Sequence, residues 1–197
     1  GAGVFINAQL GYSINDIGRK RYNAGAPGSI ARADYSSSQL SSKFAVGTDL
    51  FPVNGLTITP VVSLSHTMIN TDGYREQGGA LNMVVSSHKE NVTRAGLKVD
   101  ANVQIMDNVG TIIRPSIKVG YFYDLQNSPI ETMASFDIPG SAAFKTEGPT
   151  PSSSTILLGT GLDFISGREW ELSTDLDLLR KDGYSSYTGI ARITGYF

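Results

Sequence analysis

Apolar and polar residues alternate with a period of two in eight segments of the chain. Successive side chains of a strand point to opposite faces, so this alternation indicates strands with one apolar and one polar face. In the clearest segment, Leu97 and Val99 alternate with Arg94, Lys98 and Asp100. The eight segments cover residues 4–13, 39–50, 56–65, 94–103, 113–121, 156–164, 170–178 and 189–197. The pattern predicts an all-β protein with eight strands.

The connections between these segments are alternately long and short. Polar loops rich in Gly, Pro and Ser follow the first, third and fifth segments, around residues 24–28, 70–91 and 124–154. Tight links follow the second, fourth and sixth segments, at residues 51–55, 107–110 and 166–168, and the first contains the hairpin dipeptide Asn-Gly. This order predicts an antiparallel up-and-down sheet with its long loops at one end. An outer-membrane β-barrel has this layout, with short periplasmic turns and longer extracellular loops.

Alternation alone does not separate a soluble barrel with an apolar interior, of the lipocalin kind, from a membrane barrel with an apolar exterior. The charges on the polar faces favour the membrane barrel, because both signs are present and can offset each other across a hydrated lumen. We therefore predict that the following charged residues face the lumen: Arg94, Lys98, Asp100, Arg114, Lys118, Asp175, Asp177 and Arg192.

Aromatic residues near the ends of the segments also favour a membrane barrel, whose interfaces carry two aromatic girdles. Phe5, Phe51, Trp170 and Phe197 lie toward the short turns, whereas Tyr12, Tyr121, Tyr123, Tyr184 and Tyr187 lie toward the long loops. We assign six of them to the membrane interfaces: Tyr12, Phe51, Tyr121, Tyr123, Trp170 and Phe197.

Composition narrows the remaining classes. The 197 residues are expected to form one domain, residues 1–197, and the longest apolar run is three residues. A membrane-spanning helix needs about 20 apolar residues, so none is expected. Sixteen basic residues against eighteen acidic ones, with no basic cluster larger than residues 19–21, predict no nucleic-acid partner. The absence of cysteine excludes disulfides and thiolate metal sites.

Candidate catalytic groups are few. A nucleophile with a base and an orienting acid requires a histidine or an equivalent group, and the chain has only His66 and His88, neither beside a suitable partner. Asp175 and Asp177 share one face of one strand and could serve as acid and base, but charge balance with luminal Arg and Lys explains them better. We predict that the chain is not an enzyme and binds no metal or cofactor.

Several motifs resemble those of one known family. Residues 71–85 read TDGYREQGGALNMVV and lead into residues 93–99, TRAGLKV. The pairs Thr59-Pro60 and Arg114-Pro115 open two strands, and residues 133–136 read MASF before the sixth segment. These residues are similar to the C-terminal translocator, or β-domain, of bacterial autotransporters, the type V secretion proteins. The family pattern accounts for two prolines that fall on apolar faces, where each removes a ladder donor.

The resemblance implies a location and partners. The C-terminal residues, ITGYF, resemble the signal read by the β-barrel assembly machinery, in which Ile193, Tyr196 and Phe197 would be recognised, although Gly195 stands where an aromatic is usual. Family translocators have twelve strands and a helix in the lumen, and this chain aligns with the last eight strands. The implied protein lies in outer-membrane lipid with its loops extracellular and its C-terminus periplasmic. Its implied partners are the assembly machinery, periplasmic chaperones and its own N-terminal passenger, which it helps to export.

Two other functions remain open on the residues alone. Eight strands can close around packed side chains, so the chain could be a complete eight-stranded barrel of the OmpA or OmpX kind, acting as a membrane anchor or adhesin. A soluble ligand-binding barrel is the third candidate, and it would fold without detergent.

Overall fold

The computed structural model describes residues 3–22, 26, 28–107, 110–126, 129–166 and 170–196, which form strands joined by turns and loops. Eight long strands follow one another in one antiparallel sheet, in the order of the sequence. They are β1 (Val4–Tyr22), β2 (Ile30–Thr48), β4 (Leu56–Thr71), β7 (His88–Val103), β9 (Thr111–Asp124), β12 (Ser154–Ser166), β13 (Trp170–Lys181) and β14 (Tyr184–Gly195). Each overlaps one of the eight predicted segments, which confirms the all-β antiparallel prediction. Within the described ranges, no helix is long and apolar enough to cross a membrane.

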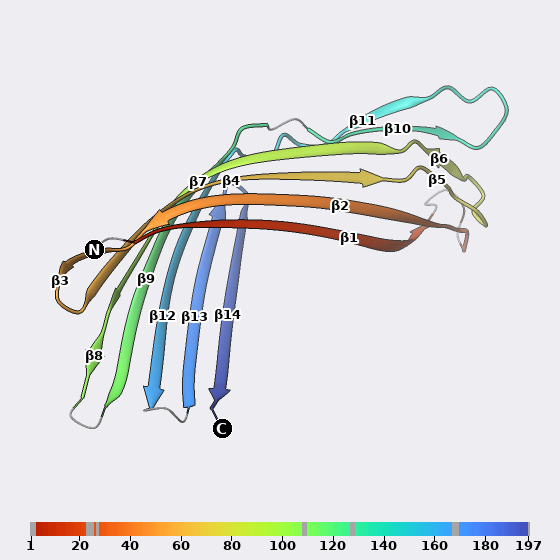
Figure 1. Ribbon diagram of the computed structural model, residues 1–197. Helices are drawn as coiled ribbons and strands as arrows, with labels where there is room; N and C mark the ends of the chain where they lie inside the picture. The colour runs from red at the N-terminus through yellow and green to blue at the C-terminus, as the bar shows by residue number, and fades with distance from the viewer. Residues whose placement is uncertain are drawn as a thin grey trace.

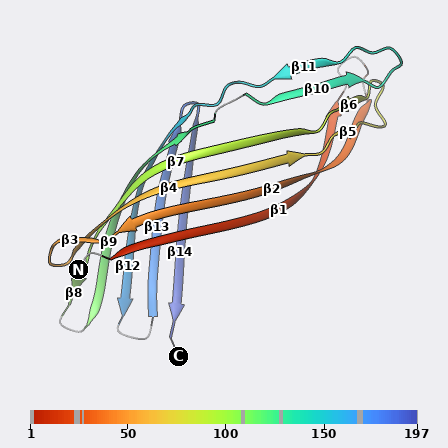
Figure 2. The same ribbon diagram turned by 45° about the horizontal axis from the view of Figure 1, so that its top comes forward.

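The sheet is curled (Figures 1 and 2). The first four long strands run across the view of Figure 1, and the last four run down it, so the sheet turns strongly between β7 and β9. Strands β1 and β14 are the two ends of the pairing path, and among the described strands each has one long-strand neighbour only. The sheet therefore keeps two open edges.

The first hairpin is longer than predicted. We expected a long loop after the first strand, but β1 and β2 stay paired without a break from Val4↔Thr48 to Tyr22↔Ile30. A strand of 19 residues spans about 60 Å, whereas the apolar band of a membrane barrel is about 25 Å tall. The far part of this hairpin therefore lies beyond the thickness that a membrane covers. The β13–β14 connection at the same end is a tight turn, with Gly183 at φ 71°.

The segments predicted as loops at 70–91 and 124–154 contain a second sheet. Its strands are β5 (Tyr74–Arg75), β6 (Met83–Val85), β10 (Glu131–Phe136) and β11 (Phe144–Glu147), in the order β11-β10-β6-β5. Figures 1 and 2 both show β5 and β6 beside the far ends of β1 and β2. These strands are too short for a period of two to stand out, and the pairing of β6 with β10 joins two different loops.

Two strands are interrupted opposite the prolines. Pairing of β4 with β2 ends at Val61, and it resumes at Ile58 with β3 (Leu50–Val53). Pro60 lies between these two points. Pro115 of β9 likewise lies between the end of β7 and the start of β8 (Ile105–Met106). Proline is tolerated where a ladder is already interrupted, which gives these prolines a physical reason.

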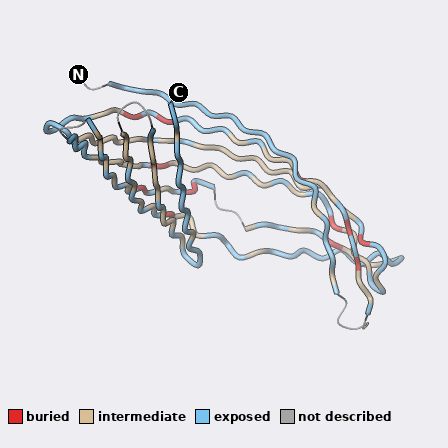
Figure 3. The backbone as a smooth tube through the Cα atoms, turned by 90° about the horizontal axis from the view of Figure 1, so that it is seen from below, coloured by how far each residue is buried: buried red, intermediate tan, exposed pale blue. Residues whose placement is uncertain are grey.

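Burial is inverted relative to a water-soluble protein. Most of the chain is exposed or half-buried (Figure 3), and large apolar side chains such as Leu10 and Ile193 are among the most exposed. The fully buried side chains of the described residues include Glu76 and Thr155. An apolar surface of this size needs a non-aqueous environment.

Candidate functional site

The polar face of the sheet forms ion pairs that reach across two strands. Lys118 of β9 contacts Asp175 of β13 at 2.8 Å and Asp177 at 3.0 Å, although β12 lies between β9 and β13. Two strand spacings amount to about 10 Å, a gap that an extended lysine side chain spans over a sheet curved toward it. The polar face is therefore the inner face of the curl.

Glycines of β12 make this contact possible. Gly159 pairs with both Lys118 and Asp177, and a Cβ at Gly159 would collide with the carboxylate of Asp177. At Gly161 a Cβ would lie 2.6 Å from Oγ of Ser116 and 2.9 Å from Oδ1 of Asp175. These two positions are open because β12 carries no side chain there, and the charged groups of β9 and β13 occupy the space.

A second charged cluster lies nearer the long loops. The guanidinium of Arg94 donates to Asp124 through Nε at 2.6 Å and through Nη2 at 3.3 Å, and Nζ of Lys181 donates to the same carboxylate at 2.8 Å. Asp124 is 5% exposed. Two cations around one buried carboxylate satisfy its charge, which would otherwise be costly to bury.

The remaining predicted charges lie on the same face. Lys98 contacts Asp100 of its own strand at 2.6 Å, and Arg114 approaches Asp163 at 3.8 Å. Arg192 pairs in register with Ser173 on the open edge strand β14 and is exposed. The structure thus gathers all eight predicted charges on one face of the sheet.

Two members of these clusters, Asp124 and Lys181, were not among the predicted residues. Asp124 and Lys181 are the last residues of β9 and β13, and we ended the predicted strands at Tyr121 and Leu178. Extending the period of two by a few residues would have placed both on the polar face.

The six aromatic residues assigned to the membrane interfaces differ in their surroundings. Tyr12, Phe51, Tyr121 and Tyr123 are exposed, and Trp170 stacks on Phe164 with ring centroids 5.2 Å apart. Phe197 lies outside the described residues.

Two further aromatics predicted near the membrane interfaces lie on the polar face instead. The ring of Phe5 covers the Cα of Gly47, and Tyr184 pairs with Lys181. Since both point away from the apolar face, neither can belong to an outward aromatic girdle.

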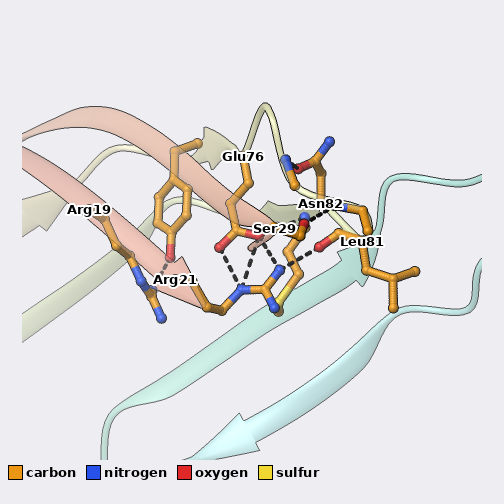
Figure 4. Close-up of polar contacts among 10 residues, drawn as sticks. Arg19, Arg21, Ser29, Glu76, Leu81 and Asn82 are labelled. Carbon is orange, nitrogen blue, oxygen red and sulfur yellow. Dashed lines mark hydrogen bonds and ion pairs between the residues drawn. The ribbon is translucent and has the colours of Figure 1, made fainter. Parts of the chain in front are cut away.

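A third cluster joins the loop between β5 and β6 to the first hairpin (Figure 4). Glu76, 2% exposed, accepts hydrogen bonds from Nε of Arg21 at 2.9 and 3.2 Å and from the backbone N–H of Met83 at 2.9 Å. Nη2 of Arg21 donates to the carbonyl of Leu81 at 2.6 Å. One buried carboxylate and one guanidinium therefore hold both sides of the loop against the end of β1.

Aromatic stacking and backbone contacts strengthen this attachment. Tyr74 stacks on Tyr35 of β2 with ring centroids 4.4 Å apart and accepts a hydrogen bond from Arg19. The backbone of Gln77 pairs with that of Arg32, with N–O distances of 2.8 and 2.9 Å. No sequence signal connects Arg21 with Glu76, because the contact joins two connections that are separate in the sequence.

The Arg21 guanidinium also changes the titration of Glu76, which lies outside the long strands. Its hydrogen bonds hold the pKa of the Glu76 carboxyl below the ordinary value of 4.5, and they outweigh the opposing effect of burial. The carboxylate therefore remains charged at neutral pH and keeps its contacts.

The two histidines each contact a polar side chain of β7. Nδ1 of His66 lies 2.9 Å from Oγ1 of Thr93, and Nε2 of His88 lies 3.3 Å from Glu90. Among the described residues, no group of three or more His, Asp or Glu side chains could hold a metal ion. A polar cavity of about 520 Å³ lies at the long-loop end of the polar face, and Arg94, Asp124 and Lys181 line part of it.

Comparison with known proteins decides the family. A family model for the autotransporter β-domain matches residues 1–177. The chain belongs to the autotransporter β-domain family. This confirms the resemblance and places the chain in the bacterial outer membrane.

The fold is that of a solved translocator domain. The translocator domain of autotransporter NalP from Neisseria meningitidis superposes with a TM-score of 0.68 at 14% identity, covering 98% of this chain and 60% of that chain. The present chain thus spans three fifths of the NalP domain. The β-domain of the Bordetella autotransporter BrkA is 12% identical, with 100% and 99% coverage and a TM-score of 0.34. No curated protein matches the sequence.

Membership of the autotransporter β-domain family bears on the two alternative functions left open by the sequence. The family comprises translocator domains rather than enzymes, and it favours neither a separate OmpA-like anchor nor a soluble ligand-binding barrel. The exposed apolar face of this autotransporter β-domain is then explained by its outer-membrane location.

Proposed function

We propose that this autotransporter β-domain chain forms the last eight strands of a larger, twelve-stranded translocator, which anchors an N-terminal passenger and helps export it. The observation that supports this proposal is that the outer edges of β1 and β14 are open. An unpaired strand edge is unsatisfied in lipid, so only closed barrels span membranes with strands. Additional strands between β14 and β1 would close the sheet. The 60% coverage of the NalP domain also supports the proposal that the chain is part of a larger barrel.

The two faces of the sheet would have different surroundings. The apolar face would contact lipid, with Tyr12, Phe51, Tyr121, Tyr123, Trp170 and Phe197 at the membrane interfaces. The polar face would line the lumen, where the clusters around Lys118 and Asp124 keep the wall hydrated.

Orientation and assembly follow from the same proposal. The long-loop end, with the second sheet, would lie outside the cell, and the C-terminus would lie in the periplasm. Ile193, Tyr196 and Phe197 would be read by the assembly machinery, after periplasmic chaperones have kept the exposed strands apart. We assign no catalytic role, cofactor or nucleic-acid partner to the chain.

Surface display of the passenger tests this proposal. The full parent protein is expressed with an epitope-tagged passenger, and the accessibility of the tag to external protease is compared with that of a version whose barrel begins at Gly1. Display by the parent and loss of display by the shortened barrel is the expected result. Equal display would show that these eight strands suffice and would overturn the proposal of a larger barrel.

A further inference from the structure

The part of the apolar face formed by β9, β12, β13 and β14 carries one cation among the described residues. The side chains that β9, β12, β13 and β14 place on this face are apolar, aromatic or small and neutral, with Arg180 as the single charged exception. The alternation along β13 is what sets Arg180 on this face, since its neighbour Lys181 lies on the opposite face and binds Asp124. Arg180 therefore differs from every other charge of these four strands.

Arg180 lies between two uncharged neighbours in the sheet. Its register neighbours are Ile156 and Ser185, and its side chain is exposed. Among the described residues, no acidic side chain forms an ion pair with it. A cation near a membrane interface costs only about 0–1 kcal/mol, and an anion supplied from outside the protein would gain a charge-assisted contact with it.

An apolar hollow lies next to Arg180. It has a volume of about 470 Å³, and five of its lining residues place their side chains on the apolar face, where Gly189 also lies: Leu158, Thr160, Leu176, Leu178 and Tyr187. Leu178 is two residues from Arg180 on the same face and pairs with Tyr187, which puts Arg180 about 7 Å along the strand from the hollow.

Gly189 keeps this hollow open. It pairs with Leu176, and a Cβ built at Gly189 would lie 3.3 Å from Cδ2 of Leu176, so a larger side chain would fill the space between them. Tyr187 flanks the hollow and is 79% exposed. A hydrocarbon chain fits the apolar lining, and the tyrosine suits the level of a lipid headgroup.

We propose that Arg180 and this hollow bind a phosphate-bearing, multiply acylated glycolipid of the outer leaflet, the lipid A part of lipopolysaccharide. The guanidinium pairs with a phosphate, for which its planar fork of donors is suited, and one acyl chain occupies the hollow. The inference rests on the proposed function, because Arg180 meets the outer leaflet only if the long-loop end is extracellular.

Lipid binding by the purified parent protein tests the site. The protein is reconstituted in phosphatidylcholine vesicles with lipopolysaccharide, dephosphorylated lipopolysaccharide or phosphatidylglycerol, and bound lipid is measured by native mass spectrometry. We expect Arg180→Gln to weaken lipopolysaccharide binding about tenfold, as loss of a charge-assisted contact implies. Gly189→Leu should weaken it by filling the hollow, and Arg180→Lys should retain part of it. Lys20→Gln is the matched control, since it removes a cation from the same face, far from the hollow.

The possible outcomes distinguish failure of the proposed lipid site from failure of the proposed translocator function. Unchanged lipopolysaccharide binding in Arg180→Gln or in Gly189→Leu overturns the site, as does equal binding of the dephosphorylated lipid or preference for phosphatidylglycerol. Asp182→Cys introduces a thiol at the β13–β14 turn, within 197 residues that have no cysteine. Labelling of intact cells by an impermeant maleimide, compared with the unsubstituted parent, reports the orientation. Labelling only after lysis overturns the orientation, whatever the lipid result. Passenger display measured on the same variants reports translocation independently.

Discussion

At the scale of single residues, the direction of each side chain decides what a substitution does. Leu97 and Lys98 are neighbours in β7, yet Leu97 lies on the apolar face, 53% exposed, and Lys98 lies on the polar face next to Asp100. Two adjacent positions of one strand therefore lie in two different environments. Matched pairs of this kind test the assignment of the faces without changing the location in the sheet.

Leu97→Arg should impair membrane assembly, whereas Lys98→Ala should leave it nearly intact. A charged arginine on a lipid-facing strand costs about 2–4 kcal/mol at the bilayer midplane, while Lys98 loses only one half-exposed ion pair. Heat-modifiable protein in isolated outer membranes measures the effect. Equal losses in both variants would show that the apolar face does not meet lipid.

Lys118→Met should destabilise the barrel more than Lys43→Met. Removing the Lys118 ammonium leaves Asp175 and Asp177 without their shared partner, at a cost of about 2 kcal/mol, while Lys43 is exposed on the same face. Urea unfolding of the parent protein in vesicles gives both values. A Lys118→Met variant as stable as Lys43→Met would remove the argument for a paired charge cluster.

At the scale of elements, the period of two identified every long strand because the two faces differ so strongly in chemistry. It failed beyond the membrane thickness, as in residues 14–22, where both faces are polar or mixed and the β1–β2 ladder nevertheless continues. It also failed for the second sheet, whose strands depend on pairing between two loops. Hydrogen bonding between distant segments leaves no local pattern to read.

The same reasoning explains which parts of the candidate site were found. The eight charges on the polar face followed from alternation within single strands. The ion-pair partners of Arg94 and Lys118 could be predicted only in part. The pairing of each cation with a carboxylate depends on the strand register and on the space left open at Gly159 and Gly161. The Arg21–Glu76 pair had no local signal, since it is a contact between a loop and a distant hairpin.

Acid should release the loop between β5 and β6 from the first hairpin. The pKa of Glu76 is lower in the folded protein than its ordinary value of 4.5, so its stabilising effect is complete above that value. The effect is lost as the pH falls through the folded pKa. Hydrogen exchange of residues 74–83 in the vesicle-bound parent, corrected for intrinsic rates, should show protection at pH 7 that declines below about pH 4.5.

Glu76→Gln provides the control for this effect. We expect it to reduce the protection of the loop at pH 7 by about 3 kcal/mol, since it leaves the half-buried Arg21 without its charge partner. It should also abolish the acid-dependent part. If Glu76→Gln still loses protection below pH 4.5, another group controls the loop.

Gly96→Val should weaken the pairing between β7 and β9. The ring of Phe122 lies against Gly96, so a side chain at this position would force the ring away. Overpacking of this kind costs about 1–3 kcal/mol. Ala95→Val, on the opposite face of the same strand, is the control, and the difference in the midpoint of heat-modifiable unfolding is the readout. Equal midpoints would mean that Phe122 does not depend on this glycine.

At the scale of the whole molecule, the open edges of β1 and β14 predict the behaviour of the chain by itself. Refolded into detergent micelles, the 197 residues should form β structure by circular dichroism but no heat-modifiable species, because the sheet lacks strands to close it. Adding the upstream barrel segment of the parent should restore heat-modifiability. A heat-modifiable species from the 197 residues alone would instead favour a self-closing eight-stranded barrel.

The order of the long strands in the sheet repeats their order in the sequence, and among the described long strands each pairs only with its predecessor and successor. Such a sheet is modular in units of one hairpin. Duplicating or deleting a hairpin would change the circumference of a closed barrel by about 10 Å and leave every other joint in place. The bore of such a protein can therefore change in discrete steps during evolution, without redesign of the strands that remain.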